Sequence, residues 1–333
     1  MKIYLKILGL LRTYKKFSII PNALIFMKNN KKAKVNGWIF VDKPLGISSN
    51  RMLQKVKRLF LNTKAGYVGT LDPMATGFLP IALGKATRTI KYLEKESKEY
   101  IFTIEWGVQT STGDLEGNIL NKKPVFPQEN NLSDNINNFK GKTLQKPHKY
   151  SAIKINGKRA YNLARDNKDF ELMQRSIEIF DLEIVKRINE RKTMFYIKCS
   201  SGVYIRSLAE DLATSLGTYG HVTSLRRIGF GNLNKKLISL DSLISLMHID
   251  KLIENLKPVD HIFEGVSKIN LGKDEAKLLL DGKFIVTDQK ISEDARNNKK
   301  LVIAKYKKDL MVIGNINGRN FYPKTIMNFN TVN

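Results

Sequence analysis

Residues 66–77, Gly-Tyr-Val-Gly-Thr-Leu-Asp-Pro-Met-Ala-Thr-Gly, place three glycines around a single carboxylate, that of Asp72. A proline disfavours the helical region for the residue before it, so Pro73 predicts an extended or turning backbone at Asp72. These residues alone leave two interpretations open. In the first, Asp72 caps a short helix that begins at Pro73. In the second, the glycines and the proline hold the carboxylate ready for chemistry.

Short strands and helices flank this stretch on both sides. Strands are predicted over residues 37–41, 100–108 and 194–199, and helices over residues 52–60 and 205–216. The strand at 100–108 alternates apolar and polar residues, and the helix at 52–60 carries apolar residues at helical spacing. The elements follow one another in mixed order, without the regular alternation of a parallel sheet. An α+β fold is therefore expected, with a mixed, mainly antiparallel sheet and flanking helices.

The rest of the chain divides by composition. Residues 109–150 are polar and are predicted as loops around a short helix over 132–139, and residues 151–175 mix basic and tyrosine side chains. Residues 231–265 predict a connecting helical region. A short helix over 274–280 and strands over 284–287, 300–306 and 310–316 then predict a small β-rich domain. We expect a domain over 36–257 and a second one over 266–328, after a basic N-terminal extension over 1–35.

Composition indicates a soluble, globular chain, and its net charge favours nucleic acid as a partner. The 333 residues are 42% hydrophobic and 26% charged, and no apolar run reaches the roughly 18 residues that span a membrane. The net charge is +26 and the pI is about 9.9. Such an excess of Lys and Arg neutralises phosphates. A genome biased towards Lys, Asn and Ile codons would give the same excess, so charge alone leaves this open.

Motif searches exclude several classes of site. Cys199 is the only cysteine, so no intrachain disulfide forms, which fits a reducing, intracellular compartment. One cysteine and four scattered histidines predict no zinc site. Both Gly-Lys pairs lack the earlier glycine of a phosphate-binding loop, because Leu79 and Ile136 stand there. Asn234 likewise breaks the dinucleotide fingerprint. No ATP, NAD or metal cofactor is expected.

The stretch around Asp72 belongs to a longer series of blocks. In chain order these are GWIFVDKPLGISSN (37–50), AGYVGTLDPMATGFLPIALGKAT (65–87), Lys98-Glu99-Tyr100, YSAIKINGKRAY (150–161), CSSGVYIRSLAEDL (199–212) and HVTSLRRIGFG (221–231). This pattern resembles the TruB family of tRNA pseudouridine synthases over residues 36–231. The C-terminal residues resemble a PUA RNA-binding domain. The resemblance implies an isomerase that converts uridine 55 in the T-loop of tRNA to pseudouridine.

The resemblance also implies roles for seven residues. The catalytic set is Asp72, Tyr100 and Arg206, and the substrate-binding set is Tyr67, Tyr204, Leu225 and Lys43. In this interpretation Asp72 is the catalytic carboxylate, and Arg206 pairs with it. Tyr100 stacks on the base and takes a proton from the sugar, Tyr204 borders the pocket, and Leu225 lines it. Lys43, with Pro44, supports the floor of the site.

Tyr67 departs from a common pattern of the family. Many members have a histidine there, and that side chain fills the space left by the flipped uridine. A tyrosine still stacks on neighbouring bases. Binding is therefore expected to survive, while any role that needs imidazole chemistry is in doubt.

The resemblance implies a monomer in the cytoplasm that binds the T-arm of tRNA without a membrane or an obligatory protein partner. Two other readings remain. The protein folds or binds tRNA, with catalysis secondary, or it is a guide-RNA-dependent relative that acts on ribosomal RNA. Activity on a naked tRNA transcript, without guide RNA or other proteins, separates the guide-dependent relative from the stand-alone enzyme.

Overall fold

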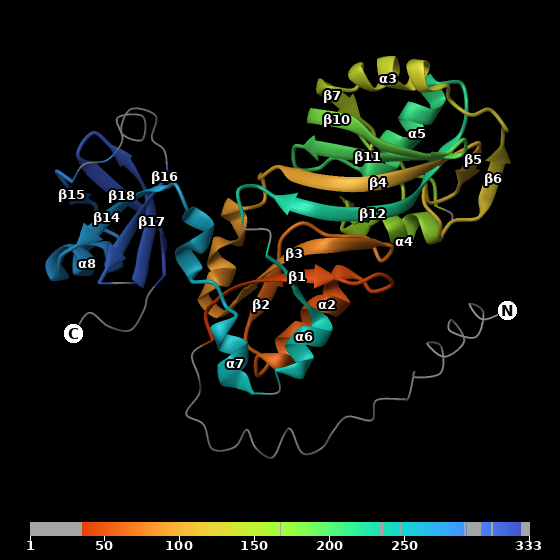
Figure 1. The fold of residues 1–333 in the computed structure, drawn as a ribbon. Helices are drawn as coiled ribbons and strands as arrows, with labels where there is room; N and C mark the ends of the chain where they lie inside the picture. Colours follow the sequence, from red (N-terminus) through yellow and green to blue (C-terminus); the bar gives the residue numbers. More distant parts are fainter. Residues whose placement is uncertain are drawn as a thin grey trace. The chain divides into compact units, whose positions relative to one another are not determined.

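The computed structural model describes residues 35–166, 168–233, 236–246, 248–289, 291, 301–307 and 309–327. The extension predicted over residues 1–35 therefore lies outside the described residues, apart from Val35. Within the described residues, two main sheets and two small hairpins form (Figure 1). The larger sheet carries the blocks around Asp72, and the smaller one is built from the C-terminal residues.

Nine strands of the described chain form the larger sheet, in the order β13-β1-β3-β12-β4-β11-β10-β7 with β2 paired to β3. Their bounds are β1 Gly37–Lys43, β2 Ala65–Tyr67, β3 Ala75–Leu83, β4 Lys98–Trp106, β7 Gly141–Gln145, β10 Arg175–Asn189, β11 Lys192–Cys199, β12 Gly220–Phe230 and β13 Ile238–Ser239. Only the pairs β1–β13 and β3–β12 are parallel. The sheet is mixed and mainly antiparallel, which confirms the expected fold class.

Helices pack on the two halves of this sheet. The helices of this region are α2 Ser49–Leu59, η3 Gly84–Tyr92, α3 Glu129–Asn137, α4 Ala160–Arg165, α5 Ile205–Ser215, α6 Leu240–Ser245, α7 Ile249–Glu254 and η4 Val259–Phe263. α3 and α5 bury apolar side chains against β4, β10, β11 and β12. α2, α6 and α7 pack on β1 and β3. The apolar stripe predicted for α2 is present, and Ser48 caps the helix, since its hydroxyl accepts from Arg51 N at 3.2 Å.

The smaller sheet has the order β14-β16-β17-β18-β15. Its strands are β14 Ser267–Leu271, β15 Ile285–Val286, β16 Leu301–Tyr306, β17 Asp309–Asn317 and β18 Asn320–Ile326, with helix α8 Lys273–Leu280. This β-rich unit agrees with the predicted PUA-like domain. Its side chains Ile303, Leu310, Ile313 and Met327 share one buried cluster with side chains of β1, β3, η3 and η4. The domain limits at 257 and 266 stay a prediction.

Several segments differ from the sequence prediction. The polar residues 109–150 contain more than loops and one helix, because β5 Val108–Thr110 pairs with β6 Ile119–Lys122, and β7 joins the large sheet. The basic segment after residue 150 forms a hairpin of β8 Lys154–Ile155 and β9 Lys158–Arg159 before α4.

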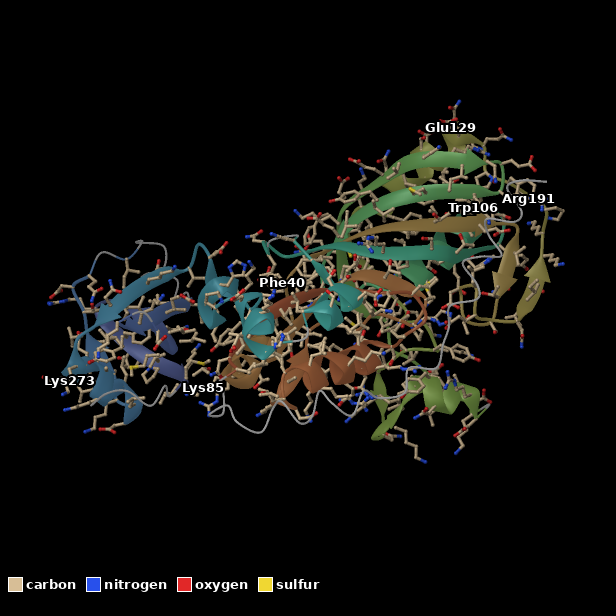
Figure 2. All side chains as sticks on the ribbon, turned by 60° about the horizontal axis from the view of Figure 1, so that its bottom comes forward. Phe40, Lys85, Trp106, Glu129, Arg191 and Lys273 are labelled. Atoms are coloured by element: carbon tan, nitrogen blue, oxygen red, sulfur yellow. The ribbon has the colours of Figure 1, made fainter. Side chains whose placement is uncertain are left out.

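β4 shows how one predicted strand organises its surroundings. Its alternate side chains Tyr100, Phe102, Ile104 and Trp106 are buried, as the period of two predicts. The backbone N–H of Trp106 donates to the Arg191 carbonyl at 2.8 Å, and the two residues lie at the same end of the sheet (Figure 2). The other end of β4 carries Lys98 and Tyr100 to the region of Asp72.

Candidate active site

Asp72 lies in the turn that joins β2 to β3. Pro73 and Met74 form a turn and Ala75 already begins β3, so the interpretation of Asp72 as the cap of a short helix is wrong. Gly69 adopts φ +69°, and a Cβ there would lie 2.9 Å from Arg227 Nη1. The glycine is thus required both by backbone conformation and by space.

The backbone of this turn is fixed at three points. The Ser49 hydroxyl, at the start of α2, donates to the Leu71 carbonyl at 2.9 Å and accepts from Leu71 N at 2.8 Å. The fully buried Lys43 Nζ donates to the carbonyls of Ile47 at 2.6 Å and Pro73 at 3.3 Å. Lys43 therefore lies beneath the turn, as expected of a residue that supports it. A backbone held in this way presents Asp72 in one orientation.

Arg206 connects Asp72 to the rest of the site. Its Nη2 lies 2.9 Å from Asp72 Oδ2, and its side chain is only 5% exposed while that of Asp72 is 38% exposed. The expected pair is therefore present. Arg206 also donates to the carbonyls of Thr112 and Tyr150, each at 2.8 Å. These bonds fix the guanidinium, so its charge stays beside the carboxylate.

Asp114 is a second carboxylate on Arg206, which the sequence did not reveal. Its Oδ2 lies 3.4 Å from Arg206 Nη1, and its side chain is 3% exposed. Its Oδ1 accepts from the Thr112 hydroxyl and, at 3.0 Å, from Glu116 N. A Thr-Gly-Asp turn in a polar segment was the only available signal. Arg206 therefore neutralises a buried carboxylate as well as the more exposed one.

The Asp72 carboxylate lies where two cavities meet. The first, of about 350 Å³, is lined by Asp72, Tyr100, Tyr204, Arg206 and Leu225 among others. The second, of about 620 Å³, shares Asp72 and Arg206 and is also lined by Tyr67. Both volumes lie in the range of small-ligand sites. The structure thus brings five of the seven predicted residues to one cavity, places Tyr67 in the adjoining one, and places Lys43 in neither.

Arg227 is a further residue that the prediction did not single out, although it lies within the block at 221–231. It is fully buried on β12, where Nε donates to the Phe78 carbonyl at 2.7 Å and Nη2 to the Gly69 carbonyl at 2.8 Å. Its guanidinium also lies close to the Tyr100 phenol. Burial raises the pKa of the Tyr100 phenol, and the charge of Arg227 opposes that rise.

Tyr204 is the residue before α5. Its backbone is held by Gln145 of β7, which accepts from Tyr204 N at 2.8 Å and donates to its carbonyl at 3.1 Å. Burial raises the pKa of the Tyr204 phenol. The phenol therefore stays neutral, with an apolar ring face available for contact. Gln145 was also missed, since nothing in its local sequence links it to residue 204.

Lys98 is a buried cation on the wall of the first cavity. Its Nζ donates to the carbonyls of Glu94 and Glu96 and lies 4.7 Å from the centroid of the Phe230 ring. Burial, aided by the nearby Arg227, lowers its pKa to about 8 from the usual 10.5. Burial also lowers the pKa of Lys43 to about 8. Lys98 is thus partly neutral just above neutral pH.

Replacing Lys98 with methionine is expected to flatten the pH dependence of stability. Above its folded pKa of about 8, Lys98 holds its proton in the unfolded chain but not in the folded one. The free energy of unfolding contributed by this group therefore rises with pH. Burial raises the pKa of the Cys199 thiol to about 12, so this group lowers the free energy of unfolding as pH rises, but only above about pH 9. Urea unfolding should show that the free energy of unfolding increases less between about pH 8 and pH 9 in Lys98→Met than in wild type. The exposed Lys95→Met is the control, and an equal increase in all three proteins would contradict the assignment.

The described residues contain no group of three or more His, Cys, Asp and Glu side chains that could hold a metal ion. In the same part of the chain, no helix combines the length and apolar character needed to cross a membrane.

Comparison with known proteins agrees with the geometry. The N-terminal domain of the TruB family pseudouridylate synthases matches residues 57–205, and the C-terminal domain of tRNA pseudouridylate synthase B matches residues 206–264. The tRNA pseudouridine synthase B of Caulobacter vibrioides is 39% identical over 260 residues, 78% of this chain and 84% of that protein. The enzyme of the same name from Agrobacterium fabrum is 35% identical over 304 residues, 89% of this chain and 96% of that protein.

Among solved structures, an archaeal box H/ACA sRNP Nop10–Cbf5 complex matches with a TM-score of 0.66 and 21% identity, over 90% of this chain and 88% of that one. This likeness shows a shared fold. The family-model matches, together with the identity to relatives over most of their length, show that the chain belongs to the TruB family of pseudouridylate synthases.

Proposed function

We propose that the protein converts uridine 55 in the T-loop of tRNA to pseudouridine. The observation that carries this proposal is the position of Asp72, which is held by a fixed turn and an ion pair to Arg206 where two nucleotide-sized cavities meet. The relatives named tRNA pseudouridine synthase B support tRNA as the substrate. The choice of uridine 55 rests on the resemblance of the sequence blocks.

The reaction breaks the bond between N1 of uracil and C1′ of ribose and forms a bond from C5 to the same carbon. The proton that leaves C5 is balanced by the proton gained at N1, so the reaction is an isomerisation. Asp72 attacks the sugar or stabilises a glycal-type intermediate. The guanidinium of Arg206 is held in place, so a positive charge stays beside the Asp72 carboxylate throughout the reaction.

The remaining residues bind and position the nucleotide. A base must leave its stack to reach Asp72, and flipped bases are held by aromatic and apolar surfaces. Tyr100 stacks on the base, while Tyr204 and Leu225 border the base. Tyr67 fills the space that the base leaves, and Lys43 supports the turn from below. The net charge of +26 attracts the RNA backbone.

The domains divide this work between them. Residues 36–257 form the catalytic domain, residues 266–328 form a PUA-like RNA-binding domain, and residues 1–35 are a basic N-terminal extension. The enzyme acts as a monomer in the cytoplasm, without an obligatory protein partner. The shared apolar cluster between the two sheets supports a fixed RNA-binding surface.

The test is a chemical map of pseudouridine in unmodified tRNA transcript after incubation with purified protein. Modification should occur at uridine 55 without guide RNA or other proteins. A transcript with cytidine at that position is the matched control and should remain unmodified. Modification at another position would contradict the proposed site. No modification, with RNA binding intact, would leave an RNA-binding or RNA-folding protein, or one that needs a guide.

A further inference from the structure

Ser151 places a buried hydroxyl group at the boundary of the two cavities. The residue is 3% exposed and lines both cavities. Its Oγ makes no hydrogen bond of ordinary geometry, a property shared within the described chain only by Trp38 Nε1 among buried side-chain polar atoms. Trp38 lies in an apolar cluster and lines neither cavity. A buried polar atom without a partner destabilises a fold, so one that faces a binding site points to a ligand.

The backbone around Ser151 is held so that the hydroxyl cannot withdraw with the loop. Arg206 donates to the Tyr150 carbonyl at 2.8 Å, and Tyr161 N donates to the Ser151 carbonyl at 3.0 Å. Arg159 donates to the Ala152 carbonyl. The active-site arginine therefore fixes the loop from one side, and the β9–α4 segment fixes it from the other.

The Tyr204 phenol lies close to this hydroxyl and competes for it. Burial raises the pKa of the Tyr204 phenol, and the nearby Ser151 side chain offsets part of that rise. The two groups nevertheless do not reach the geometry of a hydrogen bond that would satisfy Ser151 Oγ. The Ser151 hydroxyl thus lies near Tyr204 but can still form a hydrogen bond with a bound ligand.

We propose that Ser151 Oγ hydrogen-bonds a carbonyl oxygen of the flipped uracil, and does so before and after the base turns over. This inference rests on the proposed function. To bring C5 to the position of N1, the ring turns about its N3–C6 axis, which exchanges the O2 and O4 carbonyls. A hydroxyl donor beside this edge meets an equivalent acceptor in both orientations. Ser151 would therefore favour uracil over a base that presents an amino group there.

The decisive variant is Ser151→Ala. We expect kcat/KM for the tRNA transcript to fall about tenfold, because one hydrogen bond to the base is lost. The melting temperature should stay equal or rise, because the variant removes an unsatisfied buried group. Ser200→Ala is the stability control, since the Ser200 hydroxyl lines the same cavity but accepts from Glu178 N at 2.9 Å. That variant should lower the melting temperature.

Modified stem–loop RNAs identify the partner atom. Affinities of wild type and Ser151→Ala are compared for RNAs carrying uridine, 2-thiouridine, 4-thiouridine or 2′-deoxyuridine at the target position. Sulfur accepts hydrogen bonds poorly, so a thio substitution should weaken binding to wild type and have little effect on Ser151→Ala. If only the 2′-deoxy substitution weakens binding to wild type while having little effect on Ser151→Ala, the ribose is the partner and the inference is wrong.

Two other results would overturn the inference. An unchanged kcat/KM in Ser151→Ala, with active wild type, would refute it while leaving the proposed function intact. A lower melting temperature in Ser151→Ala, absent when Tyr204 is replaced by phenylalanine, would show that the hydroxyl serves Tyr204. If wild type forms no pseudouridine at all, the proposed function fails and this inference fails with it.

Discussion

Asp72→Asn is expected to lower pseudouridine formation by about 10⁴-fold or more, while RNA affinity changes by less than about tenfold. Asparagine has the same shape as aspartate but cannot attack the sugar or stabilise a cationic sugar as an anion does. The turn that carries residue 72 is held by Ser49 and Lys43, so its backbone should not move. Arg206 keeps Asp114 as an ionic partner. Single-turnover kinetics and equilibrium binding to the same transcript measure the two quantities.

Asp42→Asn is the matched control for this variant. Asp42 also pairs with an arginine, Arg226, at 2.7 and 2.9 Å, and its side chain is 33% exposed against 38% for Asp72. It lines neither cavity, so its loss should leave the rate within about threefold. A large loss of affinity in Asp72→Asn would show that the carboxylate shapes the site. Equal rates of pseudouridine formation by Asp72→Asn and Asp42→Asn would show that Asp72 takes no part in the chemistry.

Arg206→Met is expected to lower the free energy of unfolding by about 3–5 kcal/mol, because it leaves the buried Asp114 carboxylate without a cation. The same change removes the charge beside Asp72 and frees the Thr112 and Tyr150 carbonyls. Pseudouridine formation should therefore fall as well, even at temperatures at which the variant is folded. Urea unfolding gives the stability, and the transcript assay gives the rate.

Two further variants isolate the cause. Arg226→Met breaks the more exposed ion pair with Asp42 and should cost less than about 1 kcal/mol. Combining Arg206→Met with Asp114→Asn should recover part of the lost stability, because the unpaired charge is then gone. Rate should not recover in the double variant, since Asp72 still lacks its partner. A loss of stability no larger than that of Arg226→Met would refute the role assigned to Asp114.

The sequence predicted the elements whose local pattern is clear. α2, α5, β1, β4 and β11 each have a regular apolar period or a recognisable cap, and all are present. β12 was not predicted as a strand because Arg226 and Arg227 interrupt its apolar pattern, and Arg227 is buried only through contacts with distant residues. β10 was missed for a different reason. Its pairing with β11 shifts register three times, so its side chains do not alternate cleanly.

The residues of the candidate site likewise fall into those that the sequence indicates and those that it does not. Asp72, Tyr100, Tyr204, Arg206 and Leu225 lie in blocks that resemble a known family, and the fold gathers them at one cavity. The roles of these residues remain predictions. Asp114 and Gln145 act through contacts with residues more than 50 positions away, Asp114 with Arg206 and Gln145 with Tyr204. Local sequence does not record such contacts.

The order of strands also determines when the site exists during protein synthesis. β3 and β4 follow one another in the chain, yet β12 lies between them and pairs with both. A ribosome therefore makes the strand bearing Tyr100, and the turn bearing Asp72, long before the strand that joins them. Chains released before Gly220 lack β12 and leave the edges of β3 and β4 unpaired. Newly made protein is thus inactive until late in translation, and premature termination yields fragments prone to aggregation.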